Sequence, residues 1–394
     1  MKKLLIFFLA IGAGCKPESN VSPPKTNIPQ TLSVPATGAY TGAYIDFGDN
    51  EDDVTLDKIE SFEKLVGKHQ AIVASSSYWG EQTFPTTNIQ IIVSHQSIPL
   101  IFWSPWDKPY DQDIIAKNGP DRFNLNAINE GKWDAYIDAW GDAAKAIGNP
   151  MFVSFGNEMN GNWFPWSGKF YGGKDPVPGS TPEANPTPLP GYHVPMPSPC
   201  YPPVGPEIYK RAFRHVVDRV RARGASNVLW VFHANNYAEP NDLWNVMAQY
   251  YPGSDYVDWL GLSVYGEQFN GVDAFSDFAP LFDWPVTEIH ALDPSKPVML
   301  AEWGVGEFPK EGSKALWFKE AFDAMERKPF LKAAVFWHER WQNVDDSYSN
   351  LHVNSTPEAL AAYRQGVAGA HWLDRPQLHA ADIKTHSPAT PKND

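Results

Sequence analysis

Eight short apolar runs, rich in β-branched and aromatic residues, alternate with helical patterns along most of the chain. Runs of this kind are typical of strands buried on both faces, and their alternation with helices indicates a parallel sheet of βα units. The runs cover residues 42–47, 71–79, 99–106, 151–158, 227–234, 257–266, 297–304 and 333–339. Eight such units predict an α/β fold, a single (β/α)8 TIM barrel, rather than an open sheet.

Two of the intervening helices have a clear apolar face. The first face contains Trp133, Tyr136, Ile137, Trp140, Ala144 and Ile147, and the second contains Tyr209, Ala212, Phe213, Val216, Val217 and Val220. Pro206 and Glu207 predict the start of the second helix, and Gly148 and Gly224 lie just past the two ends. These helices would cover the outside of the barrel.

Residues 167–206, after the fourth run, are rich in Pro, Gly and Ser. They show neither the alternation of apolar residues typical of a strand nor the apolar periodicity of a helix. A segment of this length without secondary structure is usually functional or disordered. It leaves the carboxyl end of a strand, where active sites of barrels form. The sequence leaves two readings open: a wall over a substrate groove, or an insertion that contacts nothing.

The first residues have the pattern of an export signal. A charged start, residues 1–3, precedes an apolar stretch, residues 4–13, that is too short to span a membrane as a mature helix. Residues 11–15 (IGAGC) resemble a bacterial lipoprotein box in which Cys15 is lipidated, although Gly12 stands where Leu is usual. The alternative is an ordinary cleaved signal with an incidental Cys. Lipidation would leave Cys200 alone and exclude an intrachain disulfide.

The composition along the chain suggests four segments. Residues 1–14 are the signal, and the polar, Pro-containing residues 15–37 form a lipoprotein tether. Residues 38–370 form the catalytic barrel, and residues 371–394 form a disordered tail. We therefore expect a monomer anchored to the bacterial cell envelope, in contact with the membrane only through the lipid on Cys15. A secreted or periplasmic protein is the alternative.

The net charge and the aromatic content limit the classes of ligand that the protein is expected to bind. The formal net charge is −14, and loss of the two signal lysines would make it −16, which disfavours nucleic acid. Sixteen Trp and sixteen Tyr residues could stack on sugar rings as well as fill the core. The sequence contains no Cys/His cluster, no phosphate-binding Gly loop and no Ser-centred elbow, so we expect neither a metal nor a cofactor.

Two glutamates end apolar runs. Glu158 ends the fourth run and Glu302 lies at the end of the seventh. A strand-end carboxylate beside aromatic residues is costly for a purely structural charge. Cleavage of a glycosidic bond requires two carboxyl groups that flank the bond. The sequence therefore predicts a glycoside hydrolase with a polysaccharide substrate.

The stretch around Glu158 resembles the acid/base motif of glycoside hydrolase family 26, the mannanase family. The motif is residues 157–166 (NEMNGNWFPW), and residues 227–232, 251–261 and 301–304 resemble the family's fifth, sixth and seventh strands in order. The resemblance extends over about residues 38 to 365. The wider clan of (β/α)8 hydrolases carries its acid/base at the end of strand four and its nucleophile at the end of strand seven.

The resemblance implies a retaining double displacement on a β-linked polysaccharide, with endo-β-1,4-mannanase as the leading specificity. It assigns Glu158 as general acid/base and Glu302 as nucleophile. Tyr265 matches the family's tyrosine that hydrogen-bonds the nucleophile, and Trp337 matches the aromatic platform beneath the reacting sugar.

Two positions depart from the family. Asn157 and Ser154 replace the His and Arg that usually stand one and four residues before the acid/base, beside the sugar at the cleaved bond. Asn157 could instead bind that sugar's 2-hydroxyl. A mixed-linkage β-glucanase, a xylanase or an enzyme that trims exopolysaccharide therefore remains an alternative. A non-catalytic surface protein that binds glycans is the alternative of another class.

Other strand-end residues are weaker candidates for substrate contacts. Trp103 and Trp106 after the third run, with Trp163 and Trp166 after the fourth, could form stacking platforms, the alternative being barrel packing. His233 and Asn235 could bind sugar hydroxyls or fill the core. One acidic run lacks the spacing of a Ca²⁺-binding loop, and we expect it to be a solvated loop; it consists of Asp46, Asp49, Glu51, Asp52 and Asp53. We expect no catalytic role for Glu339.

Overall fold

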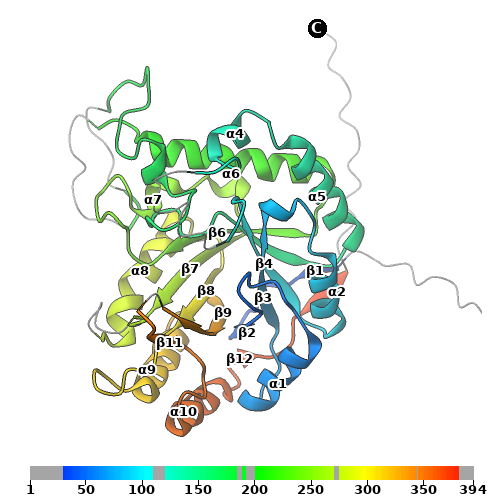
Figure 1. Ribbon diagram of the computed structural model, residues 1–394, viewed down its shortest axis with the longest axis vertical. Coiled ribbons are helices and arrows are strands. Elements are labelled where there is room, and N and C mark those ends of the chain that lie inside the picture. The colour runs from blue at the N-terminus through cyan, green and yellow to red at the C-terminus, as the bar shows by residue number, and fades with distance from the viewer. Residues whose placement is uncertain are drawn as a thin grey trace, which may run out of the picture.

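Eight parallel strands close into a barrel, which confirms the predicted fold (Figure 1). The computed structural model describes residues 30–109, 120–183, 189–191, 200–269, 275–343 and 345–380. The strands are β2 (Ala39–Ile45), β3 (Ile72–Tyr78), β4 (Ile98–Ser104), β5 (Met151–Phe155), β6 (Val228–Asn235), β7 (Trp259–Tyr265), β8 (Val298–Gly304) and β9 (Leu331–His338). Each strand pairs with the next, and β9 closes the ring on β2, from Tyr40 opposite Ala333 to Ile45 opposite His338. All eight predicted runs are strands.

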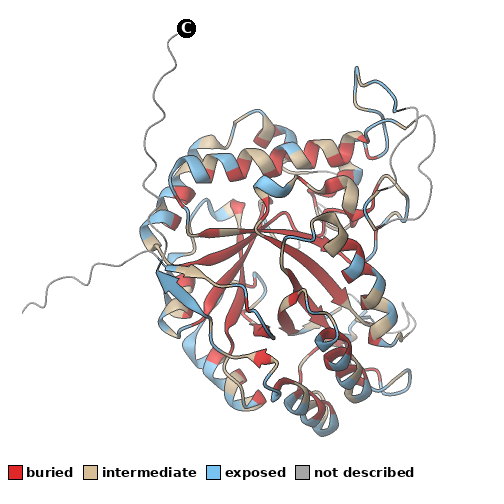
Figure 2. Cartoon of the chain, turned by 180° about the vertical axis from the view of Figure 1, so that it is seen from behind, coloured by how far each residue is buried: buried red, intermediate tan, exposed pale blue. Residues whose placement is uncertain are grey.

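Helices cover the outside of this barrel, so that the strands are buried on both faces (Figure 2). They are α1 (Leu56–Val66), α2 (Thr86–Ser94), α4 (Leu125–Asn129), α5 (Asp134–Ile147), α6 (Val204–Ala222), α7 (Met247–Tyr250), α8 (Phe278–Leu292), α9 (Lys314–Glu326) and α10 (Pro357–Val367). The apolar faces predicted for α5 and α6 are buried, and Gly148 ends α5 in the left-handed conformation. The second helix begins at Val204, so Pro206 lies in its first turn rather than at its start.

Trp103 on β4 belongs to the layer between the barrel and its helices. Its ring stacks on Trp140 of α5, with centroids 4.2 Å apart, and also packs against Trp79. Its indole N–H donates to the hydroxyl of Tyr136, also on α5. The residue has no exposed surface. The expectation that Trp103 stacks on substrate is therefore wrong, because its side chain points away from the barrel mouth.

The long segment after β5 is only partly irregular. It contains a short 3-10 helix, η2 (Gly168–Tyr171), and two isolated antiparallel bridges that join Pro176 to Pro203 and Glu183 to Cys200. Further along, the backbone of Gly191 lies against Glu288 of α8. The segment therefore contacts α8 at Gly191, and residues 184–188 and 192–199 lie outside the described part.

Both ends of the described chain meet on the amino-terminal side of the barrel. A strand at 30–32, β1 (Gln30–Leu32), pairs antiparallel with β13 (Leu378–Ala380), and β12 (Trp372–Leu373) pairs with the start of β2. The predicted tether and tail therefore contain ordered strands, a correction to the boundaries at 37 and 371; Cys15 lies outside the described residues. Within the described residues, no helix has the length and apolarity needed to cross a membrane.

Trp103→Phe is expected to lower stability without weakening substrate binding. The substitution removes buried ring volume and leaves the Tyr136 hydroxyl without its donor, at a cost on the order of 1–3 kcal/mol. Thermal unfolding should record a lower Tm, whereas KM measured well below the Tm should equal that of the wild type. A raised KM with an unchanged Tm would restore the substrate-platform interpretation.

Candidate active site

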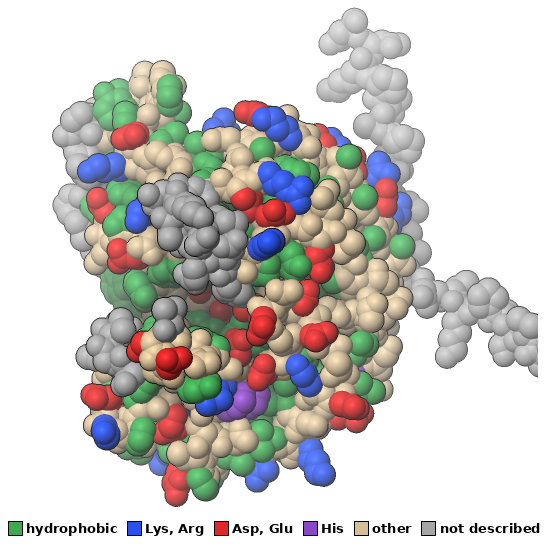
Figure 3. Space-filling view, viewed as in Figure 1, with side chains coloured by type: hydrophobic (Ala, Val, Ile, Leu, Met, Phe, Trp, Pro, Cys, Tyr) green, Lys and Arg blue, Asp and Glu red, His purple; other side chains and the backbone are tan. Residues whose placement is uncertain are grey.

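A pocket opens where the carboxyl ends of the strands meet, the side on which the sequence places the candidate residues. Its wall combines acidic, amide, hydroxyl and aromatic side chains. The lining residues are Asn50, Glu51, Ser76, Tyr78, Phe102, Ser104, Trp106, Pro109, Asn157, Phe164, Glu302 and Trp337. In Figure 3, acidic side chains gather around a hollow near the middle of the visible face. A polar pocket with aromatic walls suits an uncharged, hydroxyl-rich ligand.

A strained turn at the end of β5 presents Glu158. Both Gly156 and Glu158 have left-handed backbone conformations, with φ of 55° and 54°. A non-glycine residue adopts this conformation at a cost and usually only where the surroundings enforce it. Here the Glu158 N–H donates to the carbonyl of His233 at 2.7 Å, and the indole of Trp166 donates to the carbonyl of Asn157 at 2.6 Å. The neighbouring strand and the following loop therefore fix this glutamate.

An irregularity in β8 directs Glu302 into the barrel. The register with β7 and with β9 shifts just before this residue, so Leu262 pairs with Leu300 but Ser263 pairs with Glu302. A bulge of this kind re-aims a side chain without ending the strand. The hydroxyl of Tyr265 donates to Glu302 at 2.8 Å, and the amide of Asn157 donates to it at 3.4 Å. Tyr265 thus lies where the resemblance places it.

The structure brings the two glutamates together. One oxygen of Glu158, one oxygen of Glu302 and one nitrogen of His233 all lie within 4.8 Å of one another. Burial raises the pKa of Glu158, and burial together with the charge of Glu158 raises the pKa of Glu302 well above its ordinary value. Two desolvated carboxyl groups this close cannot both ionise easily, so the pair holds one proton near neutral pH.

His233 lies inside the barrel beside Glu158 and Glu302. It is 1% exposed, and its two ring nitrogens form hydrogen bonds with the hydroxyls of Ser154 and Ser263 at 3.1 and 2.7 Å. Burial lowers its pKa to about 3, so the ring is neutral. The expectation that His233 binds sugar is therefore replaced by a positioning role, because both nitrogens are already bonded within the core. Asn235 is also buried and bonds the backbone of Tyr237.

Trp337 forms part of the pocket wall, as a platform residue must. It stacks on Tyr44 with ring centroids 4.0 Å apart and an interplanar angle of 18°. Its indole N–H donates to Glu339 at 2.6 Å. The two contacts fix the plane of the ring.

The two tryptophans after β5 have different roles. The indole of Trp163 donates to Glu158 at 2.6 Å, and the ring is only partly buried. Trp166 is 1% exposed and stacks under Phe164, with centroids 4.5 Å apart. Phe164 and Trp106, rather than Trp166, line the pocket. The predicted platform at Trp166 is thus corrected to a support beneath Phe164.

Sequence reasoning missed two acidic residues of the site. Glu51, expected in a solvated loop, is 6% exposed, lines the pocket and accepts a hydrogen bond from Ser76 at 2.6 Å. Burial and the charge of Glu51 raise the pKa of Glu339 to about 8. Both residues also add to the raised pKa of Glu302. Glu339 follows the eighth strand directly, and this strand-end position was the signal that could have identified it.

Glu339→Gln is expected to flatten the dependence of stability on pH. The folded carboxyl keeps its proton up to about 8 whereas the free group loses it near 4.5, so the folded state binds more protons between these values. The free energy of unfolding therefore falls as pH rises through this window, and glutamine does not titrate. Tm measured across the window should fall less in the variant. Identical slopes would contradict the assignment, and Glu307→Gln, outside the pocket lining, is the matched control.

Comparisons with known proteins find similarity to glycosyl hydrolases. The sequence profile of glycosyl hydrolase family 26 matches residues 123–309, which contain Glu158 and Glu302. Endoglucanase H of Acetivibrio thermocellus is 28% identical over 343 residues, which cover 86% of this chain but 31% of that protein. The chain thus spans about a third of that relative's length.

Solved structures share the fold at low sequence identity. An endo-β-1,4-mannanase of Cellulomonas fimi superimposes with a TM-score of 0.55 at 19% identity, over 85% of this chain and 72% of that one. The catalytic domain of a Bacillus sp. JAMB-750 endo-β-1,4-mannanase superimposes with a TM-score of 0.54 at 17% identity, over 85% of this chain and 87% of that one. At such identities the likeness shows the barrel alone. The chain is thus similar to the glycosyl hydrolases of family 26 over residues 123–309 and shares the barrel fold of these mannanase structures.

Proposed function

We propose that the chain is a retaining endo-β-glycanase in which Glu302 is the nucleophile and Glu158 the general acid/base. The observation that carries this proposal is the short separation between the two carboxyl groups, one oxygen of each lying within 4.8 Å of the other. Retaining enzymes need about 5 to 5.5 Å, whereas inverting enzymes need about 6.5 to 9.5 Å to admit a water molecule. The separation here supports the retaining geometry.

In the first step, a carboxylate oxygen of Glu302 attacks the anomeric carbon while the bond to the leaving oxygen breaks. Glu158 transfers its proton to that oxygen, so the departing chain leaves as a neutral alcohol. Tyr265 and Asn157 donate hydrogen bonds that hold the nucleophile in position. The product is a glycosyl ester on Glu302.

In the second step, water attacks the anomeric carbon and Glu158 takes its proton. The ester bond breaks and Glu302 leaves as a carboxylate. Formation of the ester removes the negative charge beside Glu158, which lowers the pKa of Glu158 and suits it to act as a base. The mutual influence of the two glutamates thus switches the role of Glu158 between the steps.

The acidic wall of the pocket favours a neutral polysaccharide. Glu51 and Glu302 line it together with Trp337 and Trp106, and Glu339 lies beside them. A uronic acid chain would add charge of the same sign in a desolvated site. Flat aromatic rings suit the C–H faces of neutral hexoses.

Among neutral chains, we favour a β-1,4-linked or mixed-linkage glucan, with β-1,4-mannan as the second candidate. Mannan is what the family resemblance implies, but the mannanase structures share only the fold with this chain. The relative with sequence similarity is named an endoglucanase. The position of the family's arginine is held by Ser154, which is buried and bonded to His233, so the surroundings of the reacting sugar differ from the mannanase pattern.

We also propose that the protein is exported and carries a lipid on Cys15. The described chain begins at β1, on the side of the barrel opposite the pocket. An anchor attached there would leave the active site facing away from the membrane. Replacement of Cys15 by Ser should then release the protein from the membrane fraction, and an unchanged distribution would oppose the proposal.

The two glutamates can be tested separately. Glu302→Ala should lower turnover at least about a thousandfold on every substrate, because it removes covalent catalysis. Glu158→Ala should lose comparable activity on polysaccharide but retain the first step with an activated aryl glycoside, whose leaving group needs no proton. Azide should then yield a β-glycosyl azide from Glu158→Ala and an α-glycosyl azide from Glu302→Ala.

Glu307→Gln is the matched control, because this carboxyl bonds Ser355 outside the pocket and should leave turnover unchanged. Wild-type activity in Glu302→Ala, or an initial product with an inverted anomeric centre, would refute the mechanism. Reducing-end release from barley β-glucan, cellulose, mannan, glucomannan and xylan would decide the substrate. Faster release from mannan than from either glucan would reverse the proposed preference.

A further inference from the structure

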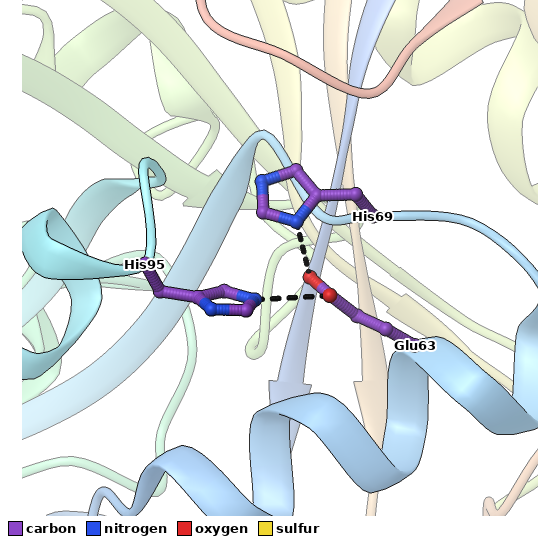
Figure 4. Close-up of side chains that lie close together, drawn as sticks. All are labelled: Glu63, His69 and His95. Carbon is purple, nitrogen blue, oxygen red and sulfur yellow. Dashed lines mark hydrogen bonds and ion pairs between the residues drawn. The ribbon is translucent and has the colours of Figure 1, made fainter.

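Three side chains that commonly bind metals converge on the amino-terminal side of the barrel, away from the pocket (Figure 4). Glu63 is on α1, His69 lies between α1 and β3, and His95 directly follows α2. The Nδ1 atom of His69 lies 2.8 Å from one carboxylate oxygen of Glu63, and the Nε2 atom of His95 lies 2.9 Å from the other. The two imidazoles approach the carboxylate from different directions.

The hydrogen bonds around His69 suit it to bind a metal ion through Nδ1. The hydroxyl of Ser97 donates to the carbonyl of Gln70 at 2.7 Å, so toward His69 its oxygen acts as an acceptor. It lies 3.5 Å from Nε2 of His69 and would accept the proton of that nitrogen when Nδ1 binds a metal ion. In that tautomer the Nδ1 lone pair would be available to a metal ion beside Glu63. At the present 2.8 Å a proton joins the two atoms, and a metal ion would displace it.

A backbone N–H orients the carboxylate of Glu63. The Gln70 N–H donates to one of its oxygens at 2.8 Å. In metal sites, hydrogen-bonding groups behind the ligands fix the orientation of a carboxylate and the tautomer of a histidine. Gln70 and Ser97 are such groups for Glu63 and His69.

We propose that Glu63, His69 and His95 bind a divalent transition metal ion such as Zn²⁺, with solvent as the fourth ligand. Two imidazole nitrogens and one carboxylate oxygen form a set that Zn²⁺ accepts in tetrahedral geometry. The side chains of His69, His95 and Glu63 are 9%, 16% and 14% exposed, so an ion can enter and a water molecule can remain.

The present separations require only small movements. Ligand atoms around a tetrahedral Zn²⁺ stand roughly 3.3 Å apart, given bonds of about 2.0 to 2.1 Å. The nitrogen–oxygen contacts would widen from 2.8 and 2.9 Å, while all the ligand atoms already lie within 4.8 Å of one another. Rotation of the side chains is sufficient to make this adjustment.

Such an ion would join α1 to the end of α2. This side of a (β/α)8 barrel contributes to stability rather than to catalysis. The site therefore predicts a metal-dependent Tm without a metal-dependent turnover, and it is independent of the proposed glycanase mechanism.

The test uses the purified protein after treatment with EDTA and dialysis. Titration with Zn²⁺ should reveal one bound equivalent by calorimetry and a raised Tm that EDTA reverses, and Co²⁺ should give the visible absorption of a tetrahedral site. The double variant His69→Gln/His95→Gln should lose this equivalent and the Tm shift. Ser97→Ala should weaken binding on the order of 10–100-fold, because it removes the partner of His69.

His215→Gln is the matched control, since His215 pairs with one carboxylate, Asp134, on α5 and should not alter binding. Glu63→Gln provides a second variant should the double variant fail to fold. A wild-type protein whose Tm and Co²⁺ spectrum do not respond would overturn the proposal and leave a hydrogen-bonded cluster. Zn²⁺ binding that persists in the double variant and inhibits hydrolysis would also overturn it, because the ion would then occupy the catalytic glutamates.

Discussion

The repulsion between two buried carboxyl groups governs the design of this site. Glu158 and Glu302 are both less than a tenth exposed, and one oxygen of each lies within 4.8 Å of the other. Burial of two like charges at that distance is costly unless they share a proton and every oxygen finds a donor. The donors are Trp163 and Ser263 for Glu158, and Tyr265 and Asn157 for Glu302. The rest of the barrel mouth holds these groups in place.

Two backbone irregularities orient the side chains of these glutamates. A left-handed residue at the end of β5 and a register shift in β8 turn the two glutamates toward each other across the mouth of the barrel. Neither feature is favourable locally, and both persist because the closed barrel fixes the neighbouring strands. The neutral His233, bonded to two serines, fills the space beneath and adds no further charge.

The two ends of the barrel have separate tasks. The carboxyl ends of the strands carry the glutamates, the aromatic wall and the additional acids Glu51 and Glu339. The amino ends carry the paired strands β1 and β13 and the cluster of Glu63, His69 and His95. Changes that affect stability can therefore accumulate at one end without disturbing the chemistry at the other.

The sequence determined the eight strands and the two glutamates, because apolar periodicity and strand ends are local features. Only the tertiary structure decided which way neighbouring side chains point. Phe102 lines the pocket whereas Trp103 faces α5, and the sequence cannot separate them because both faces of a barrel strand are apolar. Glu51 enters the pocket through a left-handed turn and a bond to Ser76. Glu63, His69 and His95 meet only because parallel strands bring successive αβ links to one end of the barrel.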